Sequence, residues 1–292
     1  MFNLTADSKM AKSIFITGAA MGLGMALSRK LAQQGWRVFA GVLPGLDTSK
    51  LTEGGLNITP IEQNVMDDAS VEASAQRVKE LLNGAGLDVL INNAGIGVKS
   101  SPIEGVDLRE AKRMFEVNTF GPIRVCKAFL PLLHESKKSP RVFNVTSGAV
   151  RVATPCNAMY NMSKSAVEGL TGTLRIELQP FGIQATSIQP GGMKTPMTAN
   201  VLDVTKASWE AVPAIVRQRY EAKLRPISEK MALDLTNANE PEYVADGIIA
   251  LLEIPVLKPR YMVGKEVKLL PMLQKLLPEL TFEKIIIKQF FG

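Results

Sequence analysis

Short apolar runs alternate with longer helical stretches along this 292-residue chain, and this alternation constrains the fold more than any other feature. Three of the helical stretches end at a glycine that suits a helix C-terminus, namely Gly35, Gly84 and Gly182. Nearly continuous apolar strands between helices predict an α/β fold, a doubly wound parallel sheet of the Rossmann type. The predicted strands are 13–17, 37–43, 58–65, 88–92, 141–146 and 183–189.

The chain contains no internal repeat or low-complexity linker, so we expect a single domain over residues 1–292 with its core at about 12–264. Two segments break the alternation. Residues 193–240 follow the sixth predicted strand and include one helical stretch, 208–224. An insertion there would lie beyond the carboxyl ends of the strands, where ligands bind in such sheets. The second segment is a helical tail, 265–292.

A glycine-rich loop directly follows the first predicted strand and opens the first helix. Its sequence, TGAAMGLG (17–24), places glycines at 18, 22 and 24. Glycines let the chain turn tightly and let a pyrophosphate approach the backbone at a helix N-terminus. The spacing differs from G-x-G-x-x-G, and no Gly-Lys-Ser/Thr follows as in a P-loop. An ordinary strand–helix turn is the alternative, but the position after the first strand favours a dinucleotide site.

Polar motifs also close the later strands. NNAG (92–95) ends the fourth, NVTS (144–147) ends the fifth and QPGGMKTPM (189–197) ends the sixth. In a parallel sheet these ends lie at one edge, together with the glycine loop. On the helix that follows, Tyr160 and Lys164 are four residues apart and therefore share one face. Packing alone does not explain this convergence.

Together these motifs resemble the short-chain dehydrogenase/reductase family, over about residues 12–200 and more loosely beyond, nearest the branch of retinol, hydroxysteroid and 3-hydroxybutyrate dehydrogenases. The resemblance implies four catalytic residues, Asn118, Ser147, Tyr160 and Lys164. It also implies that Lys164 binds the nicotinamide ribose and that Asn118 holds a water. The cofactor-binding residues implied are Gly18, Met21, Gly22, Leu23, Gly24, Leu43, Asn64, Val65, Asn93, Ala94, Gly95, Tyr160, Lys164, Pro190, Gly191 and Thr195. One departure is Asn64, where many members carry an aspartate.

The residue types themselves suggest the proton chemistry. An unperturbed tyrosine has a pKa near 10, which is too high for a base around neutrality. The ammonium of Lys164 is expected to stabilise the phenolate and lower the pKa of Tyr160. Tyr160 then exchanges a proton with a substrate alcohol or ketone, whose oxygen Ser147 hydrogen-bonds. Hydride passes between the substrate carbon and the nicotinamide.

The end of the second predicted strand bears on the choice between NAD and NADP. The sequence there, FAGVLPG (39–45), offers neither an acid for a ribose diol nor a cation for a 2′-phosphate. Binding a 2′-phosphate without a cation to pair with it would cost free energy. The missing cation therefore argues against NADP more strongly than the missing acid argues against NAD. We therefore favour NAD, with NADP as the alternative.

The substrate predicted from the sequence is a hydrophobic secondary alcohol or ketone, such as a steroid, a retinoid or an aryl-alkyl ketone. Methionines would give an adaptable apolar wall, although such methionines also occur simply as core. Two alternatives stay open: a dehydrogenase of small hydroxy acids, for which Lys194 is the candidate anion-binding residue, and a non-catalytic dinucleotide sensor or ligand-binding protein. The predicted substrate residues are Ala149, Val150, Pro155, Met159, Gly192, Met193 and Met197.

Composition excludes several other classes of protein. The net charge of +6 is spread over scattered lysines and arginines without a reading motif, so we expect no nucleic-acid partner. Cys126, Cys156 and the single histidine, His134, are too few for a disulfide framework or a metal site. No apolar run reaches the length of a membrane span, and the first residues do not resemble a signal peptide. These features predict a cytoplasmic protein.

The tail combines many apolar residues with interspersed lysines, and Pro271 and Pro278 divide it into short helical pieces. One interpretation is a peripheral membrane contact. The favoured one is a helix that covers the substrate cleft or joins subunits. By the family resemblance we expect a homodimer or homotetramer.

Overall fold

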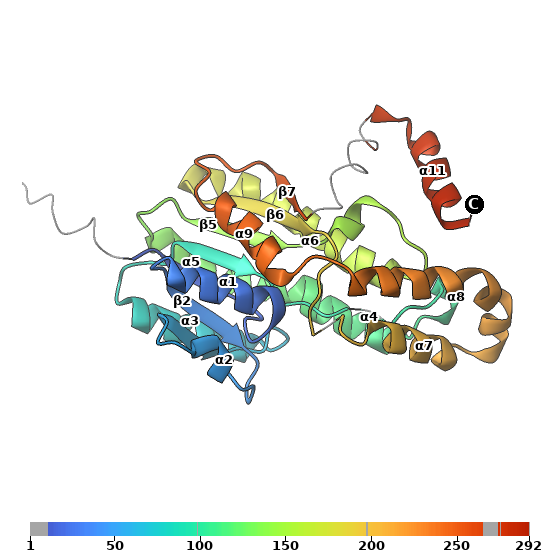
Figure 1. Ribbon diagram of the computed structural model, residues 1–292. Coiled ribbons are helices and arrows are strands. Elements are labelled where there is room, and N and C mark those ends of the chain that lie inside the picture. Colours follow the sequence, from blue (N-terminus) through green and yellow to red (C-terminus); the bar gives the residue numbers. More distant parts are fainter. Residues whose placement is uncertain (1–10, 98, 197, 265–273, 275, 292) are drawn as a thin grey trace, which may run out of the picture.

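The computed structural model describes residues 11–97, 99–196, 198–264, 274 and 276–291 (Figure 1). Its centre is a seven-stranded parallel sheet with the strand order β3-β2-β1-β4-β5-β6-β7. The predicted doubly wound parallel sheet is therefore confirmed. The strands are β1 Ser13–Ile16, β2 Arg37–Val42, β3 Ile58–Glu62, β4 Val89–Asn92, β5 Arg141–Val145, β6 Gln184–Pro190 and β7 Arg260–Val263.

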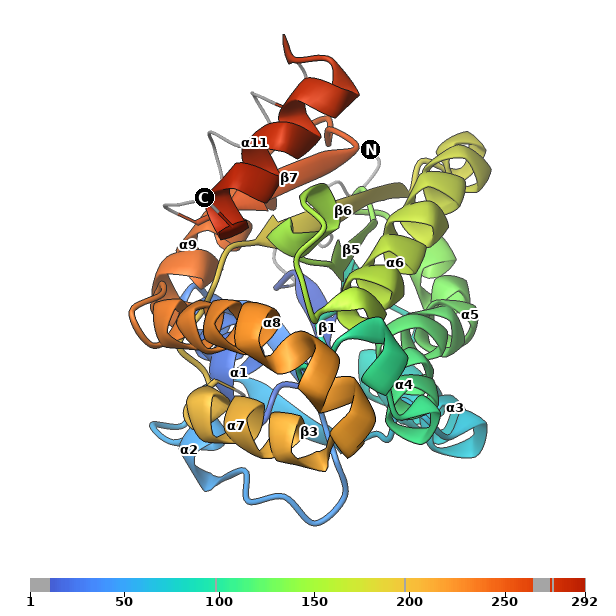
Figure 2. The same ribbon diagram turned by 90° about the vertical axis from the view of Figure 1, so that its right-hand side faces the viewer.

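Helices cover both faces of the sheet (Figure 2). The layer of α1 and α9 lies on one face, while α3, α5 and α6 lie on the other. The α-helices described are α1 Gly22–Gln33, α2 Ser49–Thr52, α3 Asp68–Leu82, α4 Leu108–Phe115, α5 Gly121–Glu135, α6 Ala158–Glu177, α7 Val201–Ala211, α8 Ala214–Thr236, α9 Pro241–Leu251 and α11 Glu279–Phe291. Shorter turns are η1 Ile103–Gly105, the π-turn η2 Glu116–Phe120, η3 Gly148–Arg151 and η4 Gln179–Phe181.

Alternating side chains of β1 build the two halves of the core. Ile14 and Ile16 join the apolar cluster beneath α1 and α9, whereas Phe15 points to the opposite face. There its ring centroid lies 4.2 Å from that of Phe129 on α5. Burial on both faces explains why β1 and β4 each carry three consecutive apolar residues, the kind of run that predicted a parallel sheet.

Two elements differ from the sequence-based prediction. Strand β7 was missed, because it is short, begins with an exposed arginine and follows Pro259. The helix predicted over 208–224 is wrong: α7 ends at Ala211 and α8 begins at Ala214, since Pro213 starts a new helix. Trp209 then hydrogen-bonds Ser228 through its indole N–H at 2.7 Å and holds the two helices together.

Gly35, Gly84 and Gly182 have φ angles of 85°, 83° and 71°, so each occupies the left-handed conformation expected just past a helix end.

In the tail, α11 begins directly after Pro278 and lies apart from the two helical layers (Figure 1). Pro271 lies outside the described residues. Among the helices described, none has the length and apolar character needed to cross a membrane.

Candidate active site

The carboxyl ends of β1, β4, β5 and β6 bring the predicted motifs to one edge of the sheet. Residue pairs such as Asn92 with Asn144 and Val145 with Ile188 lie in register across neighbouring strands. Loops that leave these strands therefore start side by side. The glycine loop, the NNAG turn, Ser147 and the turn after Pro190 all begin there.

Glycine is required in the first loop by close packing. A Cβ on Gly18 would lie 2.9 Å from the Cα of Ala94, and one on Gly24 would lie 2.3 Å from the Gly18 carbonyl oxygen. Gly18 and Gly22 also have φ angles of 64° and 55°. The N-cap residue of helix α1, Met21, makes no side-chain capping hydrogen bond, and the first turn of the helix contains no acidic residue. Its first N–H groups are therefore suited to an anionic group such as a pyrophosphate.

The NNAG turn is tied directly to the glycine loop. The hydroxyl of Thr17 accepts hydrogen bonds from the backbone N–H groups of Asn93 and Ala94, both at 2.9 Å. The Asn93 amide donates back to the carbonyl oxygens of Thr17 at 2.9 Å and Gly18 at 3.2 Å. Asn92 points into the sheet instead, where its amide donates to Asn144 at 2.8 Å. Asn93 therefore shapes the edge, and Asn92 is structural.

Asn118 and Lys164 meet at Gly95. A Cβ on Gly95 would lie 3.2 Å from the Lys164 Nζ and 3.3 Å from the Asn118 Oδ1, so any side chain there would crowd both groups. Asn118 sits in the π-turn η2 and is fully buried; its Oδ1 accepts from the Ile96 N–H at 2.8 Å. Single π-turns of this kind are frequent at functional sites. The Asn118 amide also donates to Ser163 at 3.2 Å.

Helix α6 carries Tyr160 and Lys164 one turn apart, as predicted. The Lys164 ammonium donates to the Val145 carbonyl at 3.0 Å, and burial lowers the pKa of Lys164 to about 8. Burial raises the pKa of Tyr160, and a hydrogen bond with Ser147 acts in the opposite direction. Burial outweighs that hydrogen bond, so the free protein does not show the lowered pKa of Tyr160 that we expected, and the stabilisation of its phenolate by Lys164 stays a prediction.

The other predicted cofactor residues divide into exposed and packed positions. Met21 and Leu43 are exposed at the edge. Leu23 and Val65 bury their side chains in the core, which leaves only their backbones for a ligand. The side-chain oxygen of Asn64 already accepts from the Met66 N–H at 3.1 Å, within a local turn.

The loop after β6 closes over the glycine loop. The Gly191 N–H donates to the Val263 carbonyl at 2.9 Å, which anchors the loop directly after Pro190. Farther along it, Thr195 packs against Gly22, where a Cβ would approach the Thr195 Cγ2 to 3.3 Å. These contacts bring Gly22, Pro190, Gly191 and Thr195 into one region.

The predicted substrate residues are only partly brought together. Ala149 and Val150 lie on η3, and Pro155 and Met159 flank the start of α6, all half-buried. Gly192 instead packs under α8, since a Cβ there would lie 2.9 Å from the Leu235 side chain. Met193 is partly buried and packs against the core beneath α1 and α9, which agrees with the core interpretation of this methionine, and the role of Gly192 and Met193 at the substrate stays a prediction. Met197 lies outside the described residues.

Two features of this edge were missed, the role of Ser163 and the backbone conformation of Cys156. Ser163 links the site, accepting from Asn118 and donating to the Tyr160 carbonyl at 2.8 Å; its place between Tyr160 and Lys164 was the available signal. Cys156 has a φ of 60°, and its carbonyl accepts from the Ser101 N–H. Cysteine rarely adopts the left-handed conformation, so no residue pattern indicated this turn.

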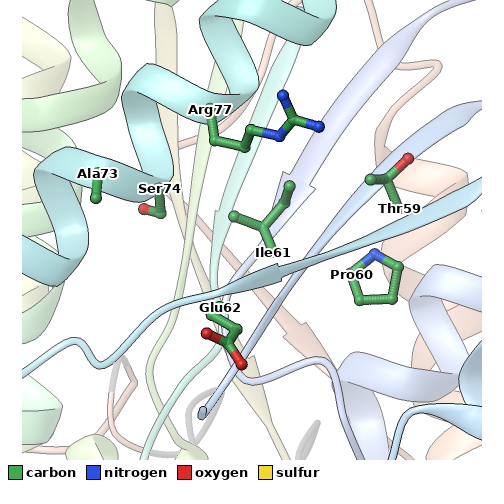
Figure 3. A pocket seen from close by; sticks show the side chains of 7 residues that line it. All are labelled: Thr59, Pro60, Ile61, Glu62, Ala73, Ser74 and Arg77. Carbon is green, nitrogen blue, oxygen red and sulfur yellow. The ribbon is translucent and has the colours of Figure 1, made fainter.

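A separate hollow of about 350 Å³ lies between the edge strand β3 and α3 (Figure 3). None of the predicted site residues lines it. The lining residues of the hollow are Thr59, Pro60, Ile61, Glu62, Ala73, Ser74 and Arg77.

Within the described part of the chain, no group of three or more His, Cys, Asp or Glu side chains is placed to hold a metal ion.

Comparison with known proteins agrees with this geometry. Residues 12–205 match the family described as short chain dehydrogenase. The chain therefore belongs to that family, a class of nicotinamide-dependent oxidoreductases that act on alcohols and ketones. Among relatives, the mouse protein named retinol dehydrogenase 5 is 34% identical over 212 residues, which cover 71% of this chain and 65% of that protein.

Other relatives match over more of their length. The rat mitochondrial D-beta-hydroxybutyrate dehydrogenase is 30% identical over 84% of this chain and 73% of that protein. The uncharacterized oxidoreductase YusZ of Bacillus subtilis is 30% identical over 96% of this chain and 99% of that protein. Among solved structures, a short-chain dehydrogenase from Streptomyces avermitilis superposes with a TM-score of 0.75 at 24% identity, covering 97% of this chain and all of that one. A short chain dehydrogenase from Burkholderia cenocepacia in complex with NADP gives 0.71 at 25% identity, covering 97% and 98%.

Proposed function

We propose that this chain interconverts a hydrophobic secondary alcohol and its ketone, with Asn118, Ser147, Tyr160 and Lys164 as the catalytic residues. The observation that carries the proposal is their meeting at the sheet edge that also bears the glycine loop. Asn118 and Lys164 both lie against Gly95, and Ser147 is near enough to Tyr160 to oppose the rise of the tyrosine pKa.

The residues of this chain supply the proton chemistry and the orientation. Because burial raises the pKa of Tyr160, its phenol is neutral at pH 7 and is ready to donate a proton to a ketone oxygen. Ser147 would hydrogen-bond the same oxygen and fix it. Lys164 keeps a positive charge next to the site that favours a developing phenolate. A bound nicotinamide would supply the hydride donor or acceptor.

The glycine loop fits the dinucleotide in backbone shape and in electrostatics. For the choice of cofactor we propose NAD. The exposed Leu43 follows β2 where a charged residue would read the adenosine ribose, and Arg37 lies at the far end of that strand, over the ring of Phe39. The Asp47 carboxylate is hydrogen-bonded to the backbone and hydroxyl of Ser49. A 2′-phosphate would therefore lack a partner among these groups.

For the substrate, the half-buried Ala149, Val150, Pro155 and Met159 support an apolar ligand. The alternative, a small hydroxy acid, would need a cation for its carboxylate. The candidate, Lys194, is already paired with Glu240 at 2.8 Å. This pairing favours the hydrophobic alcohol or ketone.

The assembly and location stay predictions. A homodimer or homotetramer in the cytoplasm is the expectation. In the tail, α11 exposes Leu280, Ile287 and Phe291, with Lys284 and Lys288 on the same helix. These exposed apolar residues support a helix that covers the substrate cleft or joins subunits, which we favour, or a peripheral membrane contact.

The test is absorbance at 340 nm with NAD or NADP across steroids, retinol, hydroxybutyrate and aryl alcohols. We expect turnover with NAD at least tenfold above that with NADP. Tyr160→Phe should lower kcat by about 10³-fold or more and leave nucleotide binding unchanged, since only the proton donor is lost. Tyr243→Phe, at an exposed position of α9, is the matched control.

Turnover that survives in Tyr160→Phe would contradict the catalytic assignment. Nucleotide binding without any Tyr160-dependent turnover on the whole panel would favour the dinucleotide sensor. A tenfold or better preference for NADP would contradict the cofactor proposal alone.

A further inference from the structure

Glu168 lies on α6 one turn beyond Lys164, and its side chain is only 16% exposed. Its carboxylate accepts three hydrogen bonds from the sheet: Thr146 Oγ1 at 2.7 Å, Gln189 Nε2 at 2.8 Å and Ser187 Oγ at 2.9 Å. A carboxylate in so enclosed a place is stable only where such donors compensate for its lost hydration. Strand β6 and the residue that follows β5 are therefore bound to α6 through one side chain.

These hydrogen bonds reach both ends of the segment 147–151. At one end, Thr146 directly precedes Ser147. At the other end, Gln189 accepts from Arg151 Nε at 2.9 Å, and Arg151 is the last residue of η3. Ser147 begins that turn and accepts from the Ala149 N–H at 3.1 Å. The backbone between Ser147 and Arg151 is thus held at each end by a chain of hydrogen bonds that starts at Glu168.

Charge adds to this restraint. Arg260 on β7 lies 3.7 Å from the Glu168 carboxylate through its Nε. Burial lowers the pKa of Arg151, the positive charge of Arg260 lowers it further, and Glu168 acts in the opposite direction. Without Glu168, two guanidinium groups that repel each other would lose a shared carboxylate.

We propose that Glu168 is a positioning residue: it fixes the segment 147–151 and thereby sets the place of the Ser147 hydroxyl and of Ala149 and Val150. The inference rests on the proposed function, in which Ser147 binds the reacting oxygen. Among the residues that the structure describes, the hydrogen-bond partners of Glu168 are Thr146, Ser187 and Gln189, so Glu168 does not hydrogen-bond any of the four proposed catalytic side chains. The effect of Glu168 on the segment 147–151 is therefore indirect. It acts through Thr146 at one end and through Gln189 and Arg151 at the other.

The experiment compares Glu168→Ala and Glu168→Gln with Glu177→Ala, an exposed position on the same helix. Glu168→Ala should lower kcat roughly 10- to 100-fold, since a misplacement of about 1 Å has this effect on catalysis, while KM for NAD stays unchanged. Glu168→Gln keeps the length and one acceptor oxygen, so it should recover part of the loss. Glu177→Ala should match the wild type.

A second measurement does not depend on turnover or on the nucleotide. Hydrogen exchange of the free protein should be faster at residues 148–152 in Glu168→Ala than in the wild type, with the rest of α6 unchanged. Should Glu168→Ala fail to fold, Thr146→Val removes one donor at nearly constant shape and should show the same local increase and a smaller loss of kcat.

Wild-type kcat and wild-type exchange in a folded Glu168→Ala would overturn the inference, as would an equal loss for Glu177→Ala. These results differ from failure of the proposed function, which would show as no Tyr160-dependent turnover in the wild type. In that case the exchange comparison still decides whether Glu168 holds the segment.

Discussion

Lys164 places an ammonium group where its side chain is only 5% exposed, and burial lowers its pKa from 10.5 to about 8. Below pH 8 the lysine is protonated in both the folded and the unfolded chain, so folding includes the full cost of burying the charge. Between pH 8 and 10.5 the unfolded chain keeps the proton and the folded one releases it. This contribution to the free energy of unfolding therefore rises with pH in that window.

Lys164→Met should stabilise the protein below pH 8 by up to about 3 kcal/mol relative to the wild type, because it removes the buried charge. This advantage should shrink as the pH rises from 8 to 10.5. Urea unfolding of both proteins at pH 7, 8.5 and 10 measures this advantage. Titrating groups that the two proteins share cancel in the difference between their free energies of unfolding. A difference that stays constant over this range would contradict the lowered pKa.

Helices α7 and α8 form a hairpin beyond the carboxyl ends of the strands, which is the place predicted for the insertion (Figure 1). Arg225 on α8 joins the two helices through Glu210 on α7 at 2.9 Å, and it also pairs with Glu229 on its own helix at 2.9 Å. The turn η1 also contacts α8. There Glu104 accepts a hydrogen bond from Arg219, and its hydrogen bond with Tyr220 raises the pKa of Tyr220.

Glu104→Gln should loosen the contact between η1 and α8, since the ion pair with Arg219 is lost. Both groups are substantially exposed, so the effect on global stability should stay within about 1 kcal/mol. The KM for the alcohol should rise by up to about fivefold, and amides of α8 should exchange faster. Glu80→Gln, in an exposed ion pair with Arg77 on α3, is the matched control. Equal exchange in the two variants would show that Glu104 does not hold the hairpin.

The sequence predicted those elements whose signal is local. A buried parallel strand needs apolar side chains on both faces, and a glycine loop needs positive φ, so both appear in the residues themselves. By contrast, β7 is a short, partly exposed edge strand, and its residues do not form a run of buried apolar side chains. It is a strand because its backbone pairs with β6. The network around Glu168 joins this residue of α6 to β6, to β7 and to the residue after β5, and Glu168 and Arg260 are 92 positions apart along the chain, so no local pattern indicates it. The inward packing of Met193 was likewise undecided until its neighbours were known.

On the scale of the whole molecule, the candidate cofactor site spans the middle of the sheet. Thr17 ties the loop after β1 to the turn after β4, and Thr195 brings the loop after β6 against Gly22. A nucleotide bound there would contact segments that are distant in sequence but belong to one cooperative fold. Binding to the folded chain alone then raises the free energy of unfolding of the entire molecule.

With NAD at 100 times its Kd, the wild type should gain about 2.7 kcal/mol, which corresponds to a rise in Tm of roughly 5–10 °C. Gly24→Ala should abolish this rise and lower the Tm of the free protein, because the added Cβ would lie 2.3 Å from the Gly18 carbonyl oxygen. Gly169→Ala is the matched control: it lies on the exposed face of α6 with nothing within 4 Å of the added carbon. Alanine is the better helix former there by about 1 kcal/mol, so the control should keep the NAD-induced rise and start from an equal or higher Tm. Thermal unfolding followed by circular dichroism measures all three proteins, and a full NAD-induced rise in Gly24→Ala would place the nucleotide away from the glycine loop.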